Sequence, residues 1–505
     1  MIIYKPVLEV NLKATFRKKI STKSAQITFK YTTKNCIFYI KQCCQKLHHH
    51  AILYKKGELR VFERKAFNQL LEWKEKYSQN YAAMLEGARR VGKSTIAEEF
   101  AKNYFKTYIK IDFANVKEEV LEVFKDIANL DVFFLRLQTV TGITLYKNES
   151  VIIFDEIQRQ PLVRQAIKYL VADGRYKYIE TGSLISIKKN VQDIVIPSEE
   201  YFIQVNPMDY EEFLLATGNN TFSLLRELYK TGKSVGEKTN RKLMRDFRIY
   251  MAVGGMPQAV DAYVSGKNFE EIDKIKRGIL KLYEEDFYKI DKSGRLSKMY
   301  NSIPPQLSLN KKRFVISNAT GKRTTLKDKE IFSELLDSKT VLISYNTTNP
   351  EISLSATADE DSYKMYLSDT GLFTTLLFNS ADKLNTKIYA KLLSDKLDAN
   401  LGYLYENVAA QMIIASGNKL FYHTWKKADM AHDYEIDFLL ASKAKLVPIE
   451  IKSSAINTHK SITEFCSKFS RKIYRQYLFS QKDVDAKEQL LYKPIYMLPF
   501  VLEEL

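Results

Sequence analysis

The residues of this chain best suited to chemistry form the run Gly87-Ala88-Arg89-Arg90-Val91-Gly92-Lys93-Ser94. The run fits G-x-x-x-x-G-K-[ST], the pattern of a loop that wraps the phosphates of a nucleoside triphosphate. Phosphate suits such a loop because its backbone N–H groups and the N-terminus of the next helix present several donors at once. We expect Lys93 to reach the β- and γ-phosphates of ATP and the Ser94 hydroxyl to bind Mg²⁺. The expected nucleotide-binding residues are Gly87, Ala88, Arg89, Arg90, Val91, Gly92, Lys93, Ser94 and Thr95.

A second group of polar residues follows short apolar runs further along the chain. The apolar residues 151–154 precede Asp155 and Glu156, as in a buried parallel strand whose carboxyl end faces a nucleotide. We expect Asp155 to hold the Mg²⁺ shell and Glu156 to polarise the attacking water as the catalytic base. A later run ends in Thr181-Gly182-Ser183, where Thr181 or Ser183 is placed to contact the γ-phosphate or the water. The alternative for Asp155 and Glu156 is an ordinary exposed, acidic strand end. The alternative for Thr181-Gly182-Ser183 is a simple turn.

Strands and helices must bring these residues together. The patterns predict strands over 82–85, 107–113, 151–156 and 178–183, and helices over 59–80, 95–102 and 117–128. Efficient hydrolysis also calls for an arginine finger. Arg159 and Arg175 are candidates by position, and a role as surface cations is the alternative.

A second constellation lies beyond residue 400. Glu406 falls on an expected helix, Asp437 on an expected strand over 435–440, and Glu450 and Lys452 on another strand, where residues two apart share a face. Helical Glu, then Asp, then Glu-x-Lys resembles the active site of the PD-(D/E)xK nuclease superfamily. The resemblance implies that Asp437 and Glu450, with the Ile451 carbonyl, bind Mg²⁺ beside a scissile phosphate. It also implies that Glu406 completes the metal shell and that Lys452 orients or acidifies the water; a chance alternation of charges is the alternative.

Several stretches taken together resemble a known family. They are Gly87–Ser94, the run Asp155-Glu156-Ile157-Gln158-Arg159-Gln160-Pro161, and Thr181-Gly182-Ser183, and the likeness continues through 207–213 and 254–257. This set is similar to the AAA+-related prokaryotic ATPases (AAA_14-like), whose usual partner is a C-terminal domain of unknown function, DUF4143. The likeness covers about residues 60–505. Many relatives carry a Gly-Arg pair where this chain reads Val195-Ile196-Pro197-Ser198-Glu199-Glu200, so no arginine contact is transferred from that position.

The expected fold class is α/β, with a P-loop parallel-sheet ATPase core, a helical lid, a winged-helix-like segment and a small α/β nuclease-like C-terminal domain. The expected boundaries are 1–58 for a basic leader, 59–220 for the ATPase core, 221–290 for the lid, 291–380 for the winged-helix-like segment and 381–505 for the nuclease-like domain. The winged helix is indicated by a helix over 331–336 followed by strands over 341–345 and 364–367. Nearby lysines and arginines at 311–313 and 322–323 would meet a phosphate backbone or form a solvated face.

Charge and cysteine content bear on the binding partners and the cellular compartment that we expect for the protein. The net charge is +18, and residues 1–58 alone hold 12 lysines and arginines against Glu9 and Glu58. That leader is interpreted as a nucleic-acid arm or a Cys/His knuckle, or more simply as a disordered or spurious extension. No apolar run approaches the ~18 residues of a membrane span, and no signal sequence begins the chain. Because the four cysteines form no disulfide framework, we expect a cytoplasmic protein.

Two functions remain open from the sequence. One is an ATPase, with ATP and Mg²⁺ as cofactors, that couples nucleotide state to a DNA-binding or DNA-cutting C-terminal module. The other is a non-cutting switch that binds DNA or a protein partner, which could be a second copy, while its nuclease-like domain is inert. Neither involves a membrane.

Overall fold

The computed structural model describes residues 61–182, 197–309, 312–378, 386–394, 401–426, 433–453, 459–487 and 489–505. The predicted basic leader, 1–58, and the predicted contact by Ser183 lie outside these described residues. No helix among the described residues is both long and apolar enough to span a membrane.

A five-stranded sheet in the order β2-β3-β4-β1-β5, with every neighbouring pair parallel, organises the first part of the described chain. Its strands are β1 Ala82–Glu86, β2 Thr107–Asp112, β3 Ser150–Asp155, β4 Lys177–Gly182 and β5 Glu200–Gln204. The central strands are apolar on both faces, because helices cover both faces of a parallel sheet. Leu85 packs in the same cluster as Phe100, whereas its neighbour Met84 packs in the same cluster as Phe133. The predicted α/β class with a parallel P-loop sheet is confirmed.

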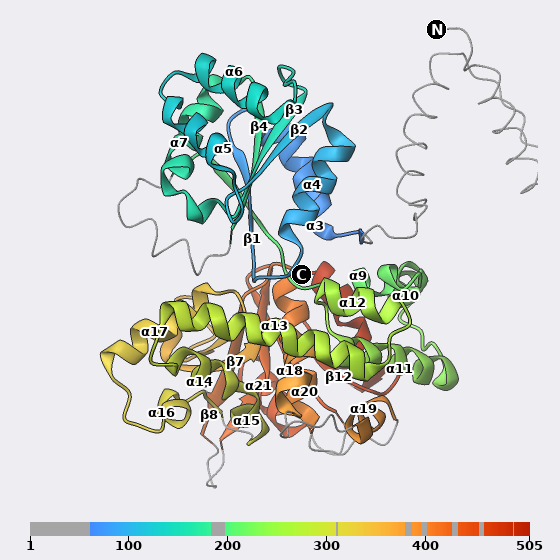
Figure 1. Ribbon diagram of the computed structural model, residues 1–505. Helices are drawn as coiled ribbons and strands as arrows, with labels where there is room; N and C mark the ends of the chain where they lie inside the picture. The colour runs from blue at the N-terminus through green and yellow to red at the C-terminus, as the bar shows by residue number, and fades with distance from the viewer. Residues whose placement is uncertain are drawn as a thin grey trace, which may run out of the picture. The chain divides into compact units, whose positions relative to one another are not determined.

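Two groups of helices cover this sheet. Its helices are α3 Lys65–Glu72, α4 Lys93–Tyr104, α5 Glu118–Val123, α6 Leu130–Thr141 and α7 Pro161–Asp173. Figure 1 shows α3 and α4 on one face and α5, α6 and α7 on the other. Helix α4, which begins with the last residues of the glycine loop, therefore lies on the face opposite α6. The two apolar clusters agree with this, because Phe100 of α4 belongs to one and Phe133 of α6 to the other.

Two of the predicted helices are too long. The helix expected over 59–80 begins only at Lys65, because Arg64 keeps an extended backbone (φ −129°) while its buried guanidinium binds Glu212. Its last part is a π-helix, Trp73–Tyr77. The helix expected over 117–128 ends at Val123 and continues only as a short 3-10 turn.

Helices dominate the middle of the chain. They are α9 Tyr210–Ala216, α10 Thr221–Thr231, α11 Glu237–Val253, α12 Pro257–Val264, α13 Phe269–Ile290, α14 Arg295–Asn301, α15 Ile303–Ser308, α16 Ile316–Thr320 and α17 Leu326–Asp337. The longest of them is α13, which runs across the lower half of Figure 1. An antiparallel hairpin follows, β6 Val341–Thr347 and β7 Ala358–Leu367, and then the helices α18 Thr370–Leu377 and α19 Thr386–Leu393.

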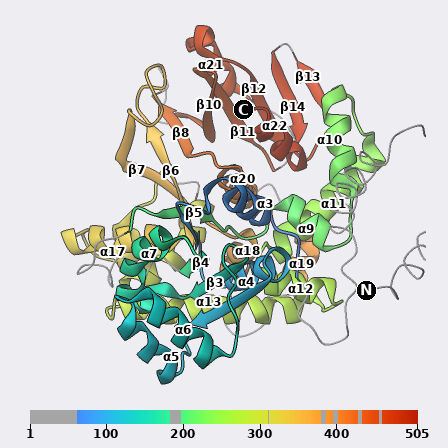
Figure 2. The same ribbon diagram turned by 90° about the horizontal axis from the view of Figure 1, so that it is seen from above.

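The hairpin extends into the C-terminal region. Strand β8 Leu420–Trp425 pairs in parallel with β6, and β9 Tyr434–Ile436 pairs with β8, so the sheet order is β7-β6-β8-β9. Figure 2 shows β7, β6 and β8 next to one another. The two strands expected as a wing are therefore part of a larger mixed sheet that includes strands from beyond residue 400.

The C-terminal region is built on a second five-stranded sheet, in the order β10-β11-β12-β14-β13. Its elements are α20 Gly402–Ala415, β10 Phe438–Ser442, β11 Lys445–Ile451, α21 Lys460–Lys468, β12 Gln476–Ser480, β13 Asp485–Lys487, β14 Leu490–Pro494 and α22 Leu498–Glu503. The strand expected over 435–440 is interrupted at Asp437. The interruption arises because β9 belongs to the four-stranded sheet while β10 pairs with β11 in this one, so Asp437 lies at the crossing between the sheets.

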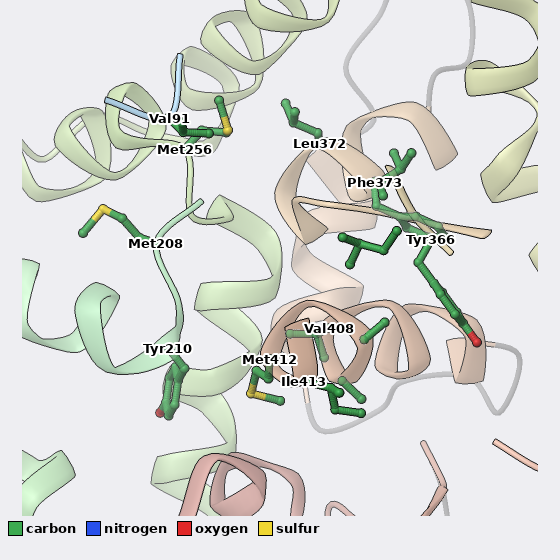
Figure 3. Packing of buried hydrophobic residues seen from close by; sticks show 14 of the residues in the cluster. Val91, Met208, Tyr210, Met256, Tyr366, Leu372, Phe373, Val408, Met412 and Ile413 are labelled. Carbon is green, nitrogen blue, oxygen red and sulfur yellow. The ribbon is translucent and has the colours of Figure 1, made fainter. Parts of the chain in front are cut away.

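One large apolar cluster runs through much of the described chain. It includes Val91 of the glycine loop, Met256 before α12, and Val408 and Ile413 on α20. Figure 3 shows these residues among fourteen members of the cluster. Residues separated by more than 300 positions therefore belong to the same core.

Candidate nucleotide site and carboxylate cluster

The glycine loop joins the end of β1 to the start of α4 and needs both of its glycines. A Cβ at Gly87 would lie 2.1 Å from the carbonyl oxygen of Val205, so no larger residue fits there. Gly92 precedes α4 in a left-handed conformation (φ +98°), which favours glycine. The loop therefore leads into the N-terminus of a 12-residue helix, where free N–H groups favour an anion.

Lys93 is buried inside this loop. Its side-chain nitrogen donates hydrogen bonds to the carbonyl oxygens of Gly87 and Ala88, at 2.9 and 3.0 Å. Burial lowers the pKa of Lys93 to about 8, although Glu156 and Asp155 act in the opposite direction. The loop thus holds a desolvated ammonium that an anionic ligand would stabilise.

Asp155 connects the loop to the neighbouring strand. The Ser94 hydroxyl donates to Asp155 Oδ1 at 2.7 Å, and the Thr181 hydroxyl, on β4, donates to the same oxygen. Lys110 on β2 lies 3.6 Å from the other carboxylate oxygen. The structure thus brings together Ser94, Asp155 and Thr181, which sequence reasoning selected. It adds Lys110, whose only signal was a lysine within an apolar strand.

Glu156 lies just beyond β3 and not within it. Its backbone is left-handed (φ +56°, ψ +45°), a conformation that costs a non-glycine residue roughly 1–2 kcal/mol. Its N–H donates to Thr181 Oγ1 at 3.2 Å, and its carboxylate accepts a hydrogen bond from Gln158. Such backbone strain is typical of functional positions, where the surrounding structure maintains it. Gln158 was not selected from the sequence.

The two arginine-finger candidates differ in their surroundings. Arg175 binds Asp173 and Asp131 at 2.8 and 2.6 Å, which commits it to local contacts on its own side of the sheet. Arg159 is exposed in the 3-10 turn that follows Glu156. Only Arg159 therefore remains available as a candidate.

Two arginines, Arg64 before the first helix and Arg89 within the glycine loop, connect the loop to distant helices, and the sequence did not predict these contacts. Arg64 donates to the Val91 carbonyl at 2.9 Å and to Glu212 at 3.1 Å. Arg89 donates two hydrogen bonds to Asp286 on α13, at 3.0 and 2.9 Å, and the Tyr283 hydroxyl donates to the Arg89 carbonyl at 2.9 Å. The loop is thus held directly by α13 and, through Arg64, by α9, over sequence distances that local patterns do not reveal.

The four C-terminal candidates lie near enough to interact electrostatically, but their hydrogen bonds include additional partners. Asp437 accepts a hydrogen bond from the Ile451 N–H at 2.8 Å, and Lys452 lies 2.5 Å from Glu450. Glu406 accepts from Lys364 at 3.4 Å and from the Tyr366 hydroxyl at 3.2 Å. Sequence reasoning missed Lys364, Tyr366 and Glu435, although a lysine among the buried residues at the end of β7 was a signal for the first.

Burial and like charge dominate the titration of this cluster. Burial raises the pKa of Asp437 well above its ordinary value, and the neighbouring Glu450 and Glu406 raise it further. Burial also raises the pKa of Glu450. Burial opposes charge on Lys364, but Glu406 and Glu435 raise its pKa well above the ordinary value. Among the described residues, no three or more His, Cys, Asp or Glu side chains form a group that could hold a metal ion.

Three family models match separate parts of the chain. Residues 79–214 match an AAA domain (AAA_14). Residues 244–383 and 401–498 match two domains of unknown function, DUF8612 and DUF4143. The resemblance to AAA_14 and DUF4143 is confirmed, and nucleotide binding is the activity that the AAA match indicates in general. The DUF8612 match spans the predicted boundary between residues 290 and 291.

Solved structures give only distant likenesses. Cdc6p from Pyrobaculum aerophilum is 12% identical with a TM-score of 0.21, over 69% of this chain and 98% of that one. ORC from Drosophila, solved bound to DNA, is 11% identical with a TM-score of 0.24, over 73% and 99%. Protein VC1899 from Vibrio cholerae is 10% identical with a TM-score of 0.17, over 84% and 96%. A comparison with curated proteins finds no match.

Proposed function

We propose that the chain binds ATP with Mg²⁺, hydrolyses it, and passes the nucleotide state to its helical and C-terminal parts. The observation that carries this proposal is the contact of Ser94, Asp155 and Thr181 beside a glycine loop that buries Lys93. These side chains follow or end three strands of one parallel sheet, at the edge where such sheets bind ligands.

The residues present fit ATP and Mg²⁺. Among the described residues, Lys93 donates to two carbonyl oxygens, and phosphate oxygens would stabilise its charge better. Ser94 and Asp155 offer the hard oxygen atoms that Mg²⁺ takes, usually one or two from protein and the rest from phosphate and water. When bound, the metal would supply positive charge against the β- and γ-phosphates.

The remaining site residues have proposed roles that follow from their contacts. Glu156 accepts the proton of the attacking water, as a carboxylate held beyond the strand end can do. The Thr181 hydroxyl contacts both the Asp155 carboxylate and the Glu156 backbone N–H, and so fixes the Glu156 backbone relative to Asp155. Ser183 stays a predicted γ-phosphate contact outside the described residues.

The coupling follows from the long-range contacts of the loop. Arg89 lies within the run that would wrap the phosphates, yet its side chain and its carbonyl are held by Asp286 and Tyr283 of α13. A nucleotide that repositions the Arg89 backbone would therefore act directly on α13. The predicted helical lid, residues 221–290, contains this helix.

Nucleotide binding and turnover test this function. Lys93→Ala should lose nearly all nucleotide affinity, whereas Lys102→Ala, an exposed lysine on the same helix that pairs with Glu98, should retain it. ATP hydrolysis is then titrated with and without added DNA. Unchanged affinity in Lys93→Ala would remove the proposal, and stimulation by DNA would identify DNA as the partner.

A second candidate function is cleavage of DNA by the C-terminal domain, in which ATP binding controls the cleavage. The proximity of Asp437, Ile451, Glu450 and Lys452 supports it, because it matches the nuclease-like resemblance. A cleavage assay with divalent metal tests it on the wild type, Asp437→Ala and Lys452→Ala. Cutting that both variants abolish supports a nuclease, and no cutting with any nucleotide supports a switch that binds DNA or a protein.

The basic residues proposed to meet DNA differ in availability. The Lys312 ammonium donates to the backbone carbonyl of Asp433 at 2.7 Å and lies 3.5 Å from the Asp433 carboxylate. This carboxylate partly compensates the charge of Lys312. Lys322 and Arg323 are exposed before α17. We therefore propose the latter pair as the better phosphate contact in this region.

A further inference from the structure

Lys364 brings a cation into the carboxylate cluster from a distant part of the chain. It lies on β7, within the segment 244–383, whereas the carboxylates lie within 401–498. Only 5% of its side chain is exposed, and its nitrogen lies 2.5 Å from Glu435 and 3.4 Å from Glu406. The nitrogen also lies 5.5 Å from the centre of the Tyr422 ring, which stabilises a cation further.

The carboxylates expected to share a metal already have donors within the chain. Asp437 accepts from the Ile451 N–H, and Glu450 accepts from Lys452. Glu406 accepts from both Lys364 and Tyr366. A divalent cation needs several such oxygens at once. Glu450 Oε2 is buried without a hydrogen-bond partner in the described part of the chain, but Glu406 Oε2 could join it around a cation only by giving up its bonds to Lys364 and Tyr366.

The residues around β7 position Lys364 firmly. Lys364 and Tyr366 are two apart on a strand and so share a face, and both reach Glu406. Tyr366 also packs against Phe438, with ring centres 5.8 Å apart, directly after Asp437. The ammonium is therefore part of the packed junction between the hairpin and the C-terminal domain.

We propose that Lys364 takes the place of a divalent cation in this cluster, which closes the C-terminal site to metal and fastens β7 to the C-terminal domain. The nuclease-like resemblance implies Mg²⁺ at Asp437, Glu450 and Glu406, and the contacts of Lys364 do not fit that ion. This inference favours the non-cutting switch over the nuclease. It does not depend on ATP hydrolysis, because every contact that carries it lies outside the glycine loop.

Metal uptake by the full chain without nucleotide tests the proposal. Mn²⁺ binding is followed by electron paramagnetic resonance, and Tb³⁺ binding by emission sensitised through Tyr366 and Tyr422. The wild type and Lys364→Arg, which keeps the cation, should take up no metal at this cluster up to about 1 mM, the weak end of protein sites for divalent cations. Lys364→Met should gain about one site, and adding Asp437→Asn and Glu450→Gln should remove it.

Stability provides a second readout. Lys364→Met leaves Glu406 and Glu435 without their cation, so its melting temperature should fall and should partly recover when Mn²⁺ is added. The wild type should show no such recovery. If Lys364→Met does not fold, the double variant Lys364→Met/Glu435→Gln is used instead in the same assays. It removes both members of the closest ion pair and so leaves no unpaired Glu435 carboxylate.

Two results would overturn the proposal. One is a wild-type site for Mn²⁺ that Asp437→Asn or Glu450→Gln removes. The other is a folded Lys364→Met, or a folded double variant, that gains no metal. Neither result would affect the ATPase proposal, which is tested separately through Lys93.

Discussion

Arg89 and Asp286 are separated by 197 residues, and the guanidinium of the first donates two hydrogen bonds to the carboxylate of the second, at 3.0 and 2.9 Å. One residue belongs to the glycine loop and the other to the last turns of α13. Because the Tyr283 hydroxyl also donates to the Arg89 carbonyl, the side chain and the backbone of Arg89 are held by the same helix. The loop and α13 therefore cannot move independently while these contacts persist.

The first prediction concerns this connection. Arg89→Ala and Asp286→Asn should each abolish the change in amide-hydrogen exchange of α13 that ATP produces in the wild type. The pair is partly exposed, so a double-mutant cycle on stability should give only about 0.5–1 kcal/mol. Lys274→Ala is the control, because it removes an exposed ion pair elsewhere on α13. An unchanged response of α13 in both test variants would contradict the coupling.

The second prediction concerns pH. Since burial lowers the pKa of Lys93 to about 8, the nucleotide-free side chain loses its proton as the pH rises above that value. Phosphate favours the ammonium, so ATP binding above pH 8 must take up a proton. ATP affinity should then fall by about tenfold per pH unit above the free pKa, until the pKa of the bound form is reached.

Calorimetry in buffers of different ionisation enthalpy measures this proton uptake directly. Lys93→Arg is the control, because a guanidinium does not deprotonate in this range. Affinity that stays constant from about pH 7 to pH 9.5 in the wild type would show that Lys93 keeps an ordinary pKa.

The third prediction separates binding from turnover. Glu156→Gln should retain ATP affinity within about threefold and lose about 100-fold or more in kcat, because the amide cannot accept a proton from water. Gln158→Ala removes the side chain that donates to Glu156 and should have a smaller effect on kcat. Steady-state hydrolysis and equilibrium binding distinguish these cases, and normal turnover in Glu156→Gln would exclude it as the base.

The fourth prediction concerns two glycines whose surroundings differ. A Cβ at Gly255 would lie 2.0 Å from the Met208 carbonyl oxygen, so Gly255→Ala should destabilise the chain by more than about 2 kcal/mol. A Cβ at Gly278, exposed on α13, would meet nothing within 4 Å. Gly278→Ala should therefore stabilise the chain by up to about 1 kcal/mol. Denaturant unfolding measures both, and equal effects would contradict the close packing at Gly255.

Local patterns predicted the core of the proposed nucleotide site. The glycine loop, the apolar strand before Asp155 and the strand that carries Thr181 are each encoded within a few neighbouring residues, so their types and order were sufficient. The length of the first helix was wrong because Arg64 is held by Glu212, which lies 148 residues away. The break at Asp437 was missed because an apolar run of this length does not reveal that two sheets share it.

The sequence by itself determined that a glycine loop of the P-loop pattern, a carboxylate pair and an acidic C-terminal set are present. Only the tertiary structure decided that Arg89 is held by α13, and that Lys364 lies against Glu435, 71 residues further along, inside that acidic set. The physical reason is that a short motif encodes its own backbone geometry. The cation that approaches a buried carboxylate is instead selected by packing of the whole chain, which no short stretch records.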